Sequence, residues 1–199
     1  VDALLVKAGS GLATLGTSTS AGVPEAYARE TLVLPLNDLE ALEATMKAYA
    51  DDLAVVAIEP IPANNGLLIQ DPGFLQGVRD LCDKYGVLLL FDEVISGFRV
   101  AFGGAAEYYG IQPDVMAFGK IIGGGMPVGA YAASAEVMDH VAPVGPVYQA
   151  GTLSGNPVAM AAGAGQLTEC LKPGFYEDQD RRTRRLVDPI LAHAERKGQ

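Results

Sequence analysis

Two charged residues follow short apolar runs, and their types could do chemistry there. Asp92 comes directly after residues 88–91, and Lys120 comes one glycine after residues 115–118. A carboxylate at the end of a buried strand loses hydration and needs a cationic or hydrogen-bonding partner. A lysine in a poorly hydrated pocket loses its proton more readily and can attack an aldehyde. The pair therefore fits a site where the lysine holds an aldehyde-bearing ring and the acid partners a ring nitrogen.

Each of these residues also has a purely structural interpretation. Asp92 could cap a nearby helix or pair with an arginine such as Arg99, and the strand pattern alone does not separate these roles from a role in a site. Lys120 could be a surface lysine on a loop. The glycines at 123–125 would let a flat ring and backbone come close, which favours a site. Only the acid and the lysine taken together indicate a site that binds an aldehyde-bearing ring.

A third segment consists of small and hydroxylated residues, at positions 150–157, just before a predicted helix. Backbone N–H groups at the start of a helix bind phosphate, and this composition suits them. The alternative is an ordinary helix cap by Ser154 or Asn156. Both interpretations stay open from the residues alone.

Strands and helices alternate around these residues. Asn37 and Asp71 are expected to cap the first two helices, and Gly86 to end the second. This alternation predicts an α/β fold with a mostly parallel sheet and flanking helices, in which ligands bind beyond the carboxyl ends of the strands. Strands are expected at 4–6, 53–58, 87–91, 115–118 and 129–133, and helices at 38–49, 72–85, 156–171 and 175–197.

Composition and charge exclude several classes of protein. The 199 residues are 49% hydrophobic, which fits a packed domain, and the net charge of −10 disfavours nucleic acid or an anionic membrane as a partner. No signal peptide and no membrane-length apolar run is visible. Cys82 and Cys170 fall in apolar helical patterns and suit a reducing cytoplasm. His140 and His193 lack metal-ligand spacing, and no metal is expected.

The N-terminal loop and the two ends of the chain lead to two further expectations. Residues 8–24 are rich in Gly, Ser, Thr and Ala, and form either an active-site lid or a flexible connection. The chain starts at Val1 rather than at a methionine and stops in a charged helical stretch at Gln199. We therefore expect it to be an internal piece of a longer protein.

Read together, these segments resemble the class III pyridoxal-phosphate-dependent aminotransferases, which have fold type I, and within them the glutamate-1-semialdehyde aminomutase subfamily. The resemblance covers essentially the whole chain. It implies that residues 1–199 form a partial large domain, without the family's N-terminal segment and C-terminal small domain. The segments that carry the resemblance are 6–11 (VKAGSG), 37–40 (NDLE), Glu59-Pro60 with Asn64, 91–99 (FDEVISGFR), 119–125 (GKIIGGG) and 148–157 (YQAGTLSGNP).

The resemblance implies a role for each site residue. The cofactor would be pyridoxal 5'-phosphate or its pyridoxamine form, in a site shared between the subunits of a homodimer. Lys120 would form the Schiff base and move protons, and Asp92 would bond the pyridine nitrogen. The other implied contacts are Ile95 near the ring, Asn64 near the ring hydroxyl, Gly151 and Thr152 at the neighbouring subunit's phosphate, and Ser10 in the lid.

The implied reaction is an isomerisation of a small amino-aldehyde, from glutamate 1-semialdehyde to 5-aminolevulinate, which supplies tetrapyrrole (porphyrin) biosynthesis. Class III transaminases usually carry glutamine at the position of Ile95, and a Gly-Glu-Gly stretch where this chain has residues 63–66 (ANNG). Both differences favour the aminomutase. The alternatives are an ω-transaminase of the same class and a non-catalytic module. Without the missing segments, the chain alone is expected to have little turnover.

Overall fold

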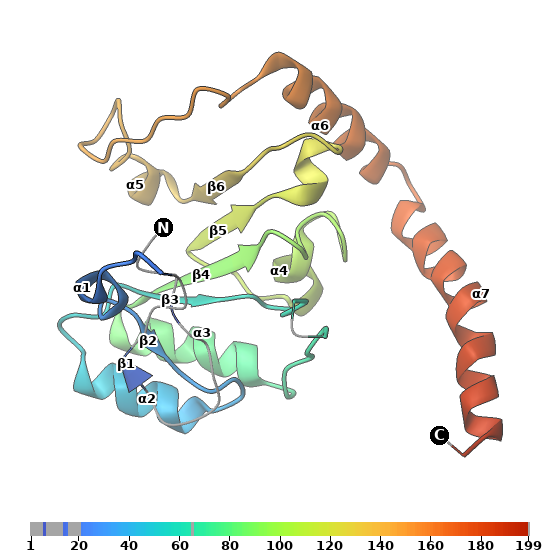
Figure 1. Cartoon of the computed structure of the whole chain (residues 1–199), viewed down its shortest axis with the longest axis horizontal. Coiled ribbons are helices and arrows are strands. Elements are labelled where there is room, and N and C mark those ends of the chain that lie inside the picture. The colour runs from blue at the N-terminus through green and yellow to red at the C-terminus, as the bar shows by residue number, and fades with distance from the viewer. Residues whose placement is uncertain (1–5, 7–13, 16–20, 65, 199) are drawn as a thin grey trace. The chain divides into compact units, whose positions relative to one another are not determined.

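The computed structural model describes residues 6, 14–15, 21–64 and 66–198. The chain divides into two compact units, Val1–Leu90 and Phe91–Gln199. Figure 1 draws the whole chain, coloured by residue number. Most of the strand predicted at 4–6 and the predicted lid residue Ser10 lie outside the described residues. Most of the predicted lid, residues 8–24, also lies outside them, whereas the other predicted helices and strands fall within them.

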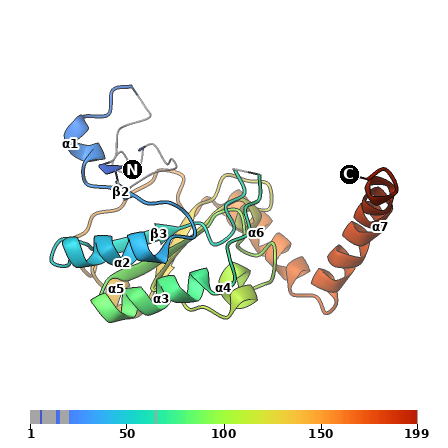
Figure 2. The same cartoon turned by 90° about the horizontal axis from the view of Figure 1, so that it is seen from below.

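The first unit contains two helices that lie side by side, α2 (Leu39–Ala48) and α3 (Phe74–Tyr85) (Figure 2). Met46 of α2 and Val78 and Cys82 of α3 each have at most 1% of their surface exposed, which confirms the prediction that Cys82 is a core residue. The remaining elements are β1 (Thr14–Leu15), α1 (Glu25–Ala28), β2 (Leu32–Val33), β3 (Val55–Ile58) and the start of β4 (Leu88–Glu93), with β1 antiparallel to β2 and β3 beside β4.

The predicted cap of α2 is wrong by one residue. Asp38 caps the helix, because its side chain accepts a hydrogen bond from the Ala41 N–H at 2.8 Å. Asn37 has a left-handed backbone with φ of 64°, a conformation that asparagine tolerates better than most residues. Its Oδ1 instead accepts from the Asp71 N–H at 3.0 Å. The Asn37 amide therefore joins the two segments that lead into α2 and α3.

The predicted start of α3 is also wrong, whereas its predicted end is confirmed. Asp71 and Pro72 precede the helix, and Gly73 stands at the cap with φ of 83° and no side chain to bond. The Phe74 N–H donates to the backbone oxygen of Asp71 at 3.0 Å. Gly86 ends the helix in the left-handed region, φ 67°, and its N–H bonds the oxygen of Cys82.

The second unit carries the rest of the sheet. After β4 come α4 (Gly104–Tyr109), β5 (Val115–Phe118), a short 3₁₀ helix η2 (Lys120–Gly123) and β6 (Ala130–Ala133), and β5 lies between β4 and β6. Strand β6 is antiparallel to β5, with Val115 opposite Ala133. The fold is α/β with a mostly parallel sheet, as predicted. The unit continues with α5 (Ala135–Met138), α6 (Pro157–Cys170) and α7 (Phe175–Arg196).

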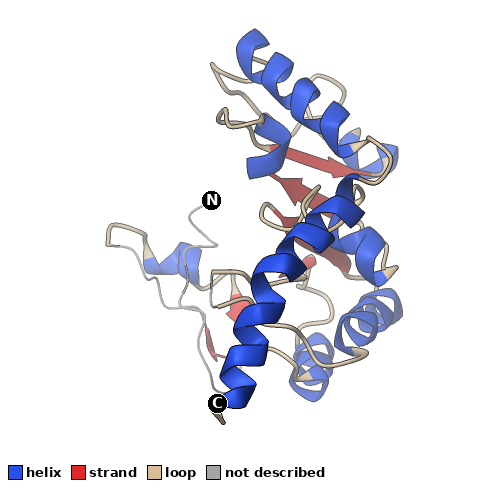
Figure 3. Ribbon diagram, turned by 90° about the vertical axis from the view of Figure 1, so that its right-hand side faces the viewer, coloured by secondary structure: helices blue, strands red, loops and turns tan. Residues whose placement is uncertain are grey.

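Helix α7 is 22 residues long, and none of its residues is buried. Figure 3 shows it as a single long helix that ends near the C-terminus. Arg181 and Arg182 both pair with Asp178, and Arg184 pairs with Asp180, so its basic residues form ion pairs along one solvated helix. In α6, Cys170 is 3% exposed, which confirms its predicted burial. No helix in the described ranges is both long and apolar enough to cross a membrane.

Candidate cofactor site at the ends of two neighbouring strands

The acid pair Asp92 and Glu93 lies inside β4, which runs two residues further than predicted. Phe91 is buried, Asp92 is half-buried, and Glu93 has no exposed surface. Because successive side chains of a strand point to opposite faces, the two acids face opposite sides of the sheet. The two carboxylates therefore have different surroundings and different roles.

The carboxylate of Asp92 is only partly engaged. Its Oδ1 accepts a hydrogen bond from the Val94 N–H at 3.0 Å, and no other donor among the described residues reaches it. Arg99 does not pair with it, because the Arg99 Nε donates to the backbone oxygen of Ile95 at 2.8 Å. Neither structural alternative for Asp92 is formed in the described chain. The second carboxylate oxygen is left to accept from a partner outside the chain.

The buried acid Glu93 was not singled out from the sequence. Its Oε2 accepts from the Ser96 hydroxyl at 2.7 Å and from the Ala105 N–H at 2.8 Å, and its Oε1 accepts from the Ala106 N–H at 2.8 Å. The helix-capping role that was an alternative for Asp92 is thus filled by Glu93, which bonds the N–H groups at the start of α4. An available signal was its position at the end of an apolar run, three residues before a serine.

Lys120 stands at the end of β5, after the buried Gly119. Its backbone has φ of 45°, a left-handed conformation that costs a non-glycine residue about 1–2 kcal/mol. Such conformations are concentrated at functional sites, where the surrounding structure imposes them. The side chain is exposed, and no carboxylate of the described residues pairs with it. This exposure fits the alternative of a surface lysine as well as a site, and the side chain attacks an aldehyde only as the deprotonated amine.

Close packing connects the ends of β4 and β5. A Cβ added at Gly97, in the turn after Asp92, would lie 2.7 Å from the Phe118 ring, and one added at Gly119 would lie 3.2 Å from Val94 Cγ1. The turn after β4 thus rests on the residues that lead into Lys120. The sequence predicted that Asp92 and Lys120 stand at the ends of different strands, and in the structure these strands, β4 and β5, are neighbours.

Helix α6 supports the turn that carries Lys120. Backbone approaches backbone at two glycines, since a Cβ at Gly163 would collide with the Ile122 oxygen and one at Gly124 with the Ala162 oxygen. These contacts leave room for no side chain at either position. The helix therefore fixes η2, whose first residue is Lys120.

The predicted phosphate segment lies before α6 and is exposed. Gly151 and Thr152 are both exposed, as are their neighbours Tyr148 (83%) and Leu153 (70%). Asn156 caps α6 by accepting from the N–H groups of the helix start at 3.0 and 3.2 Å, so the predicted cap alternative is formed there. In the described chain, no contact joins Gly151 or Thr152 to Lys120.

The remaining predicted site residues are Asn64, Ser10 and Ile95. Asn64 is exposed in the turn that follows Glu59-Pro60, and Ser10 lies outside the described residues. Ile95 is half-buried in the second unit, in the turn after Asp92. Of the predicted set, the structure therefore places Asp92, Ile95 and Lys120 in one region.

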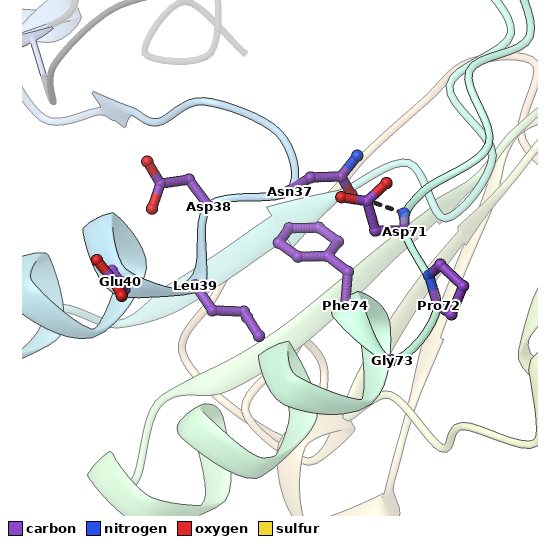
Figure 4. A pocket seen from close by; sticks show the side chains of 8 residues that line it. All are labelled: Asn37, Asp38, Leu39, Glu40, Asp71, Pro72, Gly73 and Phe74. Atoms are coloured by element: carbon purple, nitrogen blue, oxygen red, sulfur yellow. Dashed lines mark hydrogen bonds between the residues drawn. The ribbon is translucent and has the colours of Figure 1, made fainter.

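A separate pocket of about 420 Å³ lies where α2 and α3 begin (Figure 4). Three of its lining residues are acids, Asp38, Glu40 and Asp71, and it contains none of the predicted site residues. A lining of carboxylates without a basic side chain repels a phosphate group. This pocket is therefore not the cofactor site.

Comparison with known proteins identifies the family. The family model for class III aminotransferases matches residues 4–199. Glutamate-1-semialdehyde 2,1-aminomutase 2 of Brevibacillus brevis is 54% identical over 197 residues, and the corresponding aminomutase of Desulforudis audaxviator is 55% identical; each alignment covers 99% of this chain and 46% of the relative. A solved transaminase with pyridoxal phosphate (PLP) bound is 34% identical, with a TM-score of 0.83, over 98% of this chain and 47% of that one. The chain belongs to the class III aminotransferases.

Proposed function

We propose that this chain is the cofactor-binding part of a pyridoxal-phosphate enzyme that converts glutamate 1-semialdehyde to 5-aminolevulinate, for tetrapyrrole synthesis in the cytoplasm. Two relatives that carry the name of this aminomutase support the proposal, at 54 and 55% identity. The chain spans about half the length of these relatives. The activity is therefore proposed for the whole protein that contains the chain.

The observation that carries the proposal is the placement of Asp92 and Lys120 at the ends of neighbouring strands. Pyridoxal phosphate supplies an aldehyde, and a ring that withdraws electrons when its nitrogen is protonated. Lys120 would bind the aldehyde through Nζ and move protons at that atom. The free oxygen of Asp92 would accept from the ring N–H and hold that proton in place.

The side chains present fit such a ring. Asp92 keeps one oxygen without a donor from the described residues, and Lys120 forms no ion pair among them. Ile95 offers an apolar surface in the turn between the two strand ends. It also stands where class III transaminases usually carry glutamine, which favours the aminomutase within the family.

We further propose a homodimer in which Gly151 and Thr152 bind the phosphate in the neighbouring subunit. The exposure of both residues, together with the exposed Tyr148 and Leu153, supports this, since apolar surface beside small residues suits a contact with another chain. Asn64 and Ser10 keep the roles that the resemblance implies for them.

The test uses the full product of the gene that encodes this chain. The protein is given glutamate 1-semialdehyde alone, and 5-aminolevulinate is measured without an added amino donor or acceptor. We expect product, because an isomerase returns the same amino group to its substrate. The Lys120→Ala variant is the control and should form none, nor should it retain cofactor after borohydride reduction.

A class III transaminase is the second candidate, because the transaminase structure with bound PLP aligns with 98% of this chain. That activity needs a separate amino donor and consumes it in proportion to product. Turnover that appears only when a donor amine is supplied would replace the aminomutase with this candidate. Borohydride labelling at a lysine other than Lys120 would refute the site itself.

A further inference from the structure

Among the described residues, Glu93 is an acid with no exposed surface at all. An ionised carboxylate in such a place is stable only when its oxygens accept several hydrogen bonds. Glu93 accepts three, from the Ser96 hydroxyl and from the Ala105 and Ala106 N–H groups. The proposed chemistry at Asp92 and Lys120 does not use this carboxylate, so its burial needs another explanation.

Both the side chain and the backbone of Glu93 hold the turn at 94–97. The side chain binds Ser96, and the backbone oxygen accepts from the Gly97 N–H at 2.8 Å. The same turn contains Val94, whose N–H donates to Asp92 Oδ1 at 3.0 Å. Separate hydrogen bonds therefore tie both Glu93 and Asp92 to the same turn, and the backbone of residues 94–97 connects them.

The close contacts at two glycines show that Glu93 and the turn at 94–97 are tightly packed. Gly104 has φ of 69°, and a Cβ there would lie 2.5 Å from Glu93 Oε2. A Cβ at Gly97 would lie 2.7 Å from the Glu93 backbone oxygen and 2.7 Å from the Phe118 ring. The carboxylate is thus enclosed on one side, and the turn is pressed against the end of β5 on the other.

We infer that Glu93 is a positioning residue for the reaction. It fixes the turn at 94–97 so that the Val94 N–H orients the Asp92 carboxylate toward the ring nitrogen, and so that Ile95 meets the ring. This inference rests on the proposed function. Glu93 touches neither substrate nor cofactor in this account, and acts through the turn alone.

The inference requires a carboxylate, not only a side chain of that shape. In Glu93→Gln, one oxygen becomes an NH₂ group that cannot accept a hydrogen bond. Each oxygen receives at least one backbone N–H, so the amide leaves at least one buried donor without an acceptor. The matched control is Glu107→Gln on α4, an exposed glutamate that accepts from the Gly103 N–H and has no bond to the turn.

The experiment uses the full gene product loaded with pyridoxal phosphate labelled with ¹⁵N in the ring. The ¹⁵N chemical shift reports whether the ring nitrogen is protonated. We expect Glu93→Gln to move this shift toward the neutral value and to weaken cofactor binding about tenfold, which corresponds to about 1.4 kcal/mol. In the cofactor-free protein, the Val94 amide should exchange about tenfold faster. Glu107→Gln should change none of the three.

Two further variants test the hydrogen bond from Ser96 and the role of Asp92. Ser96→Ala removes one donor and should move the same readouts in the same direction by a smaller amount, so it replaces Glu93→Gln if that variant does not fold. Asp92→Asn tests the underlying site. If it shifts the ¹⁵N signal while Glu93→Gln and Ser96→Ala leave that signal unchanged, Glu93 is only structural. If Asp92→Asn also leaves it unchanged, the proposed role of Asp92 fails instead.

Discussion

Two short regions of the second unit carry predicted cofactor contacts, and they are built in opposite ways. The turn at 94–97 is packed from both sides, with Ser96 3% exposed and Gly97 buried. The segment at 144–155, which we call the exposed segment, has Tyr148 83% and Leu153 70% exposed. Both regions are rich in small residues, so composition alone does not distinguish them.

The difference shows which part of a site one chain can build for itself. The turn at 94–97 finds its partners, Glu93 and Phe118, inside the same unit, so its geometry is fixed before any ligand arrives. The backbone hydrogen bonds of the exposed segment join residues that are close in sequence, such as Val147 to His140 and Ser154 to Gly151, and Asn156 caps the helix that follows. The geometry of the segment would be completed by another surface, which agrees with the proposal that Gly151 and Thr152 serve a neighbouring subunit.

The largest predicted contrast comes from one added methyl group in each region. Gly97→Ala would press a Cβ against the Glu93 backbone oxygen and the Phe118 ring, and we expect it to lower the free energy of unfolding by about 1–3 kcal/mol. In Gly151→Ala the close atom is the Ser154 hydroxyl oxygen, which can rotate away, so the change should stay within about 0.5 kcal/mol. Urea unfolding measures both. Equal losses would show that the two regions are packed alike.

A second prediction concerns Asn156, which follows the exposed segment and caps helix α6. Its Oδ1 accepts from the Val158 and Ala159 N–H groups, so Asn156→Ala should destabilise the protein by about 1 kcal/mol. Ser154→Ala, two residues earlier, removes a hydroxyl that caps nothing and should have an effect near zero. Thermal unfolding compares them. If Ser154→Ala lowers the stability as much as Asn156→Ala does, the exposed segment is packed at Ser154.

A third prediction concerns Tyr176, which supports the packed region from the start of α7. Its hydroxyl donates to the backbone oxygen of Phe98 at 3.0 Å, and Phe98 has a left-handed backbone with φ of 57°. Tyr176→Phe removes this bond and should cost about 0.5–1 kcal/mol, measured by urea unfolding. Tyr27→Phe, at an exposed tyrosine, is the control and should cost nothing measurable.

The pH dependence of Tyr176 gives an independent check. Burial, with a smaller contribution from Cys170, raises the pKa of Tyr176 to about 12 from its usual value of 10.0. The neutral hydroxyl is favoured in the fold, so its contribution is complete below pH 10.0 and is lost as the pH rises toward 12. The difference between the parent protein and Tyr176→Phe should therefore be constant around neutral pH. A difference that already falls at neutral pH would contradict this assignment.

Local patterns predicted the elements that depend on neighbours in sequence. Strand β5 and helix α7 follow from an apolar run and a charged helical pattern, and Gly86 follows from the need for a left-handed residue at a helix end. The placement of Asp92 and Lys120 followed from the rule that ligands bind beyond strand ends. These predictions needed no knowledge of distant contacts.

Two of the misses, at Glu93 and Asn37, involve partners that are distant in sequence. Glu93 bonds N–H groups 12 and 13 residues away, and the Asn37 amide bonds an N–H 34 residues away. No local pattern reveals such a bond, so Asn37 was predicted to be a cap and Glu93 was overlooked. The exposure of Thr152 could not be predicted either, because a segment rich in small residues can be packed or free.

The smallest predicted effect lies in the first unit, outside both regions. Glu43 of α2 bonds Lys84 at 2.6 Å and Tyr85 at 3.1 Å, both on α3, and pairs with Lys47 at 3.3 Å. The Lys84 hydrogen bond, followed by those of Lys47 and Tyr85, lowers the pKa of Glu43 from 4.5 to about 2. The ionised form is favoured in the fold, so this contribution is present above pH 4.5 and is lost as the pH falls toward 2.

Glu43→Gln should therefore remove part of the acid sensitivity of unfolding in that window, measured as the shift of the urea midpoint between pH 4.5 and lower pH. The effect should be slight and should shrink at high salt, because the pair is largely exposed and screened. Glu25→Gln, at an exposed ion pair within the short helix α1, should leave the acid sensitivity unchanged. If Glu43→Gln leaves it unchanged too, the link between α2 and α3 depends on apolar packing alone.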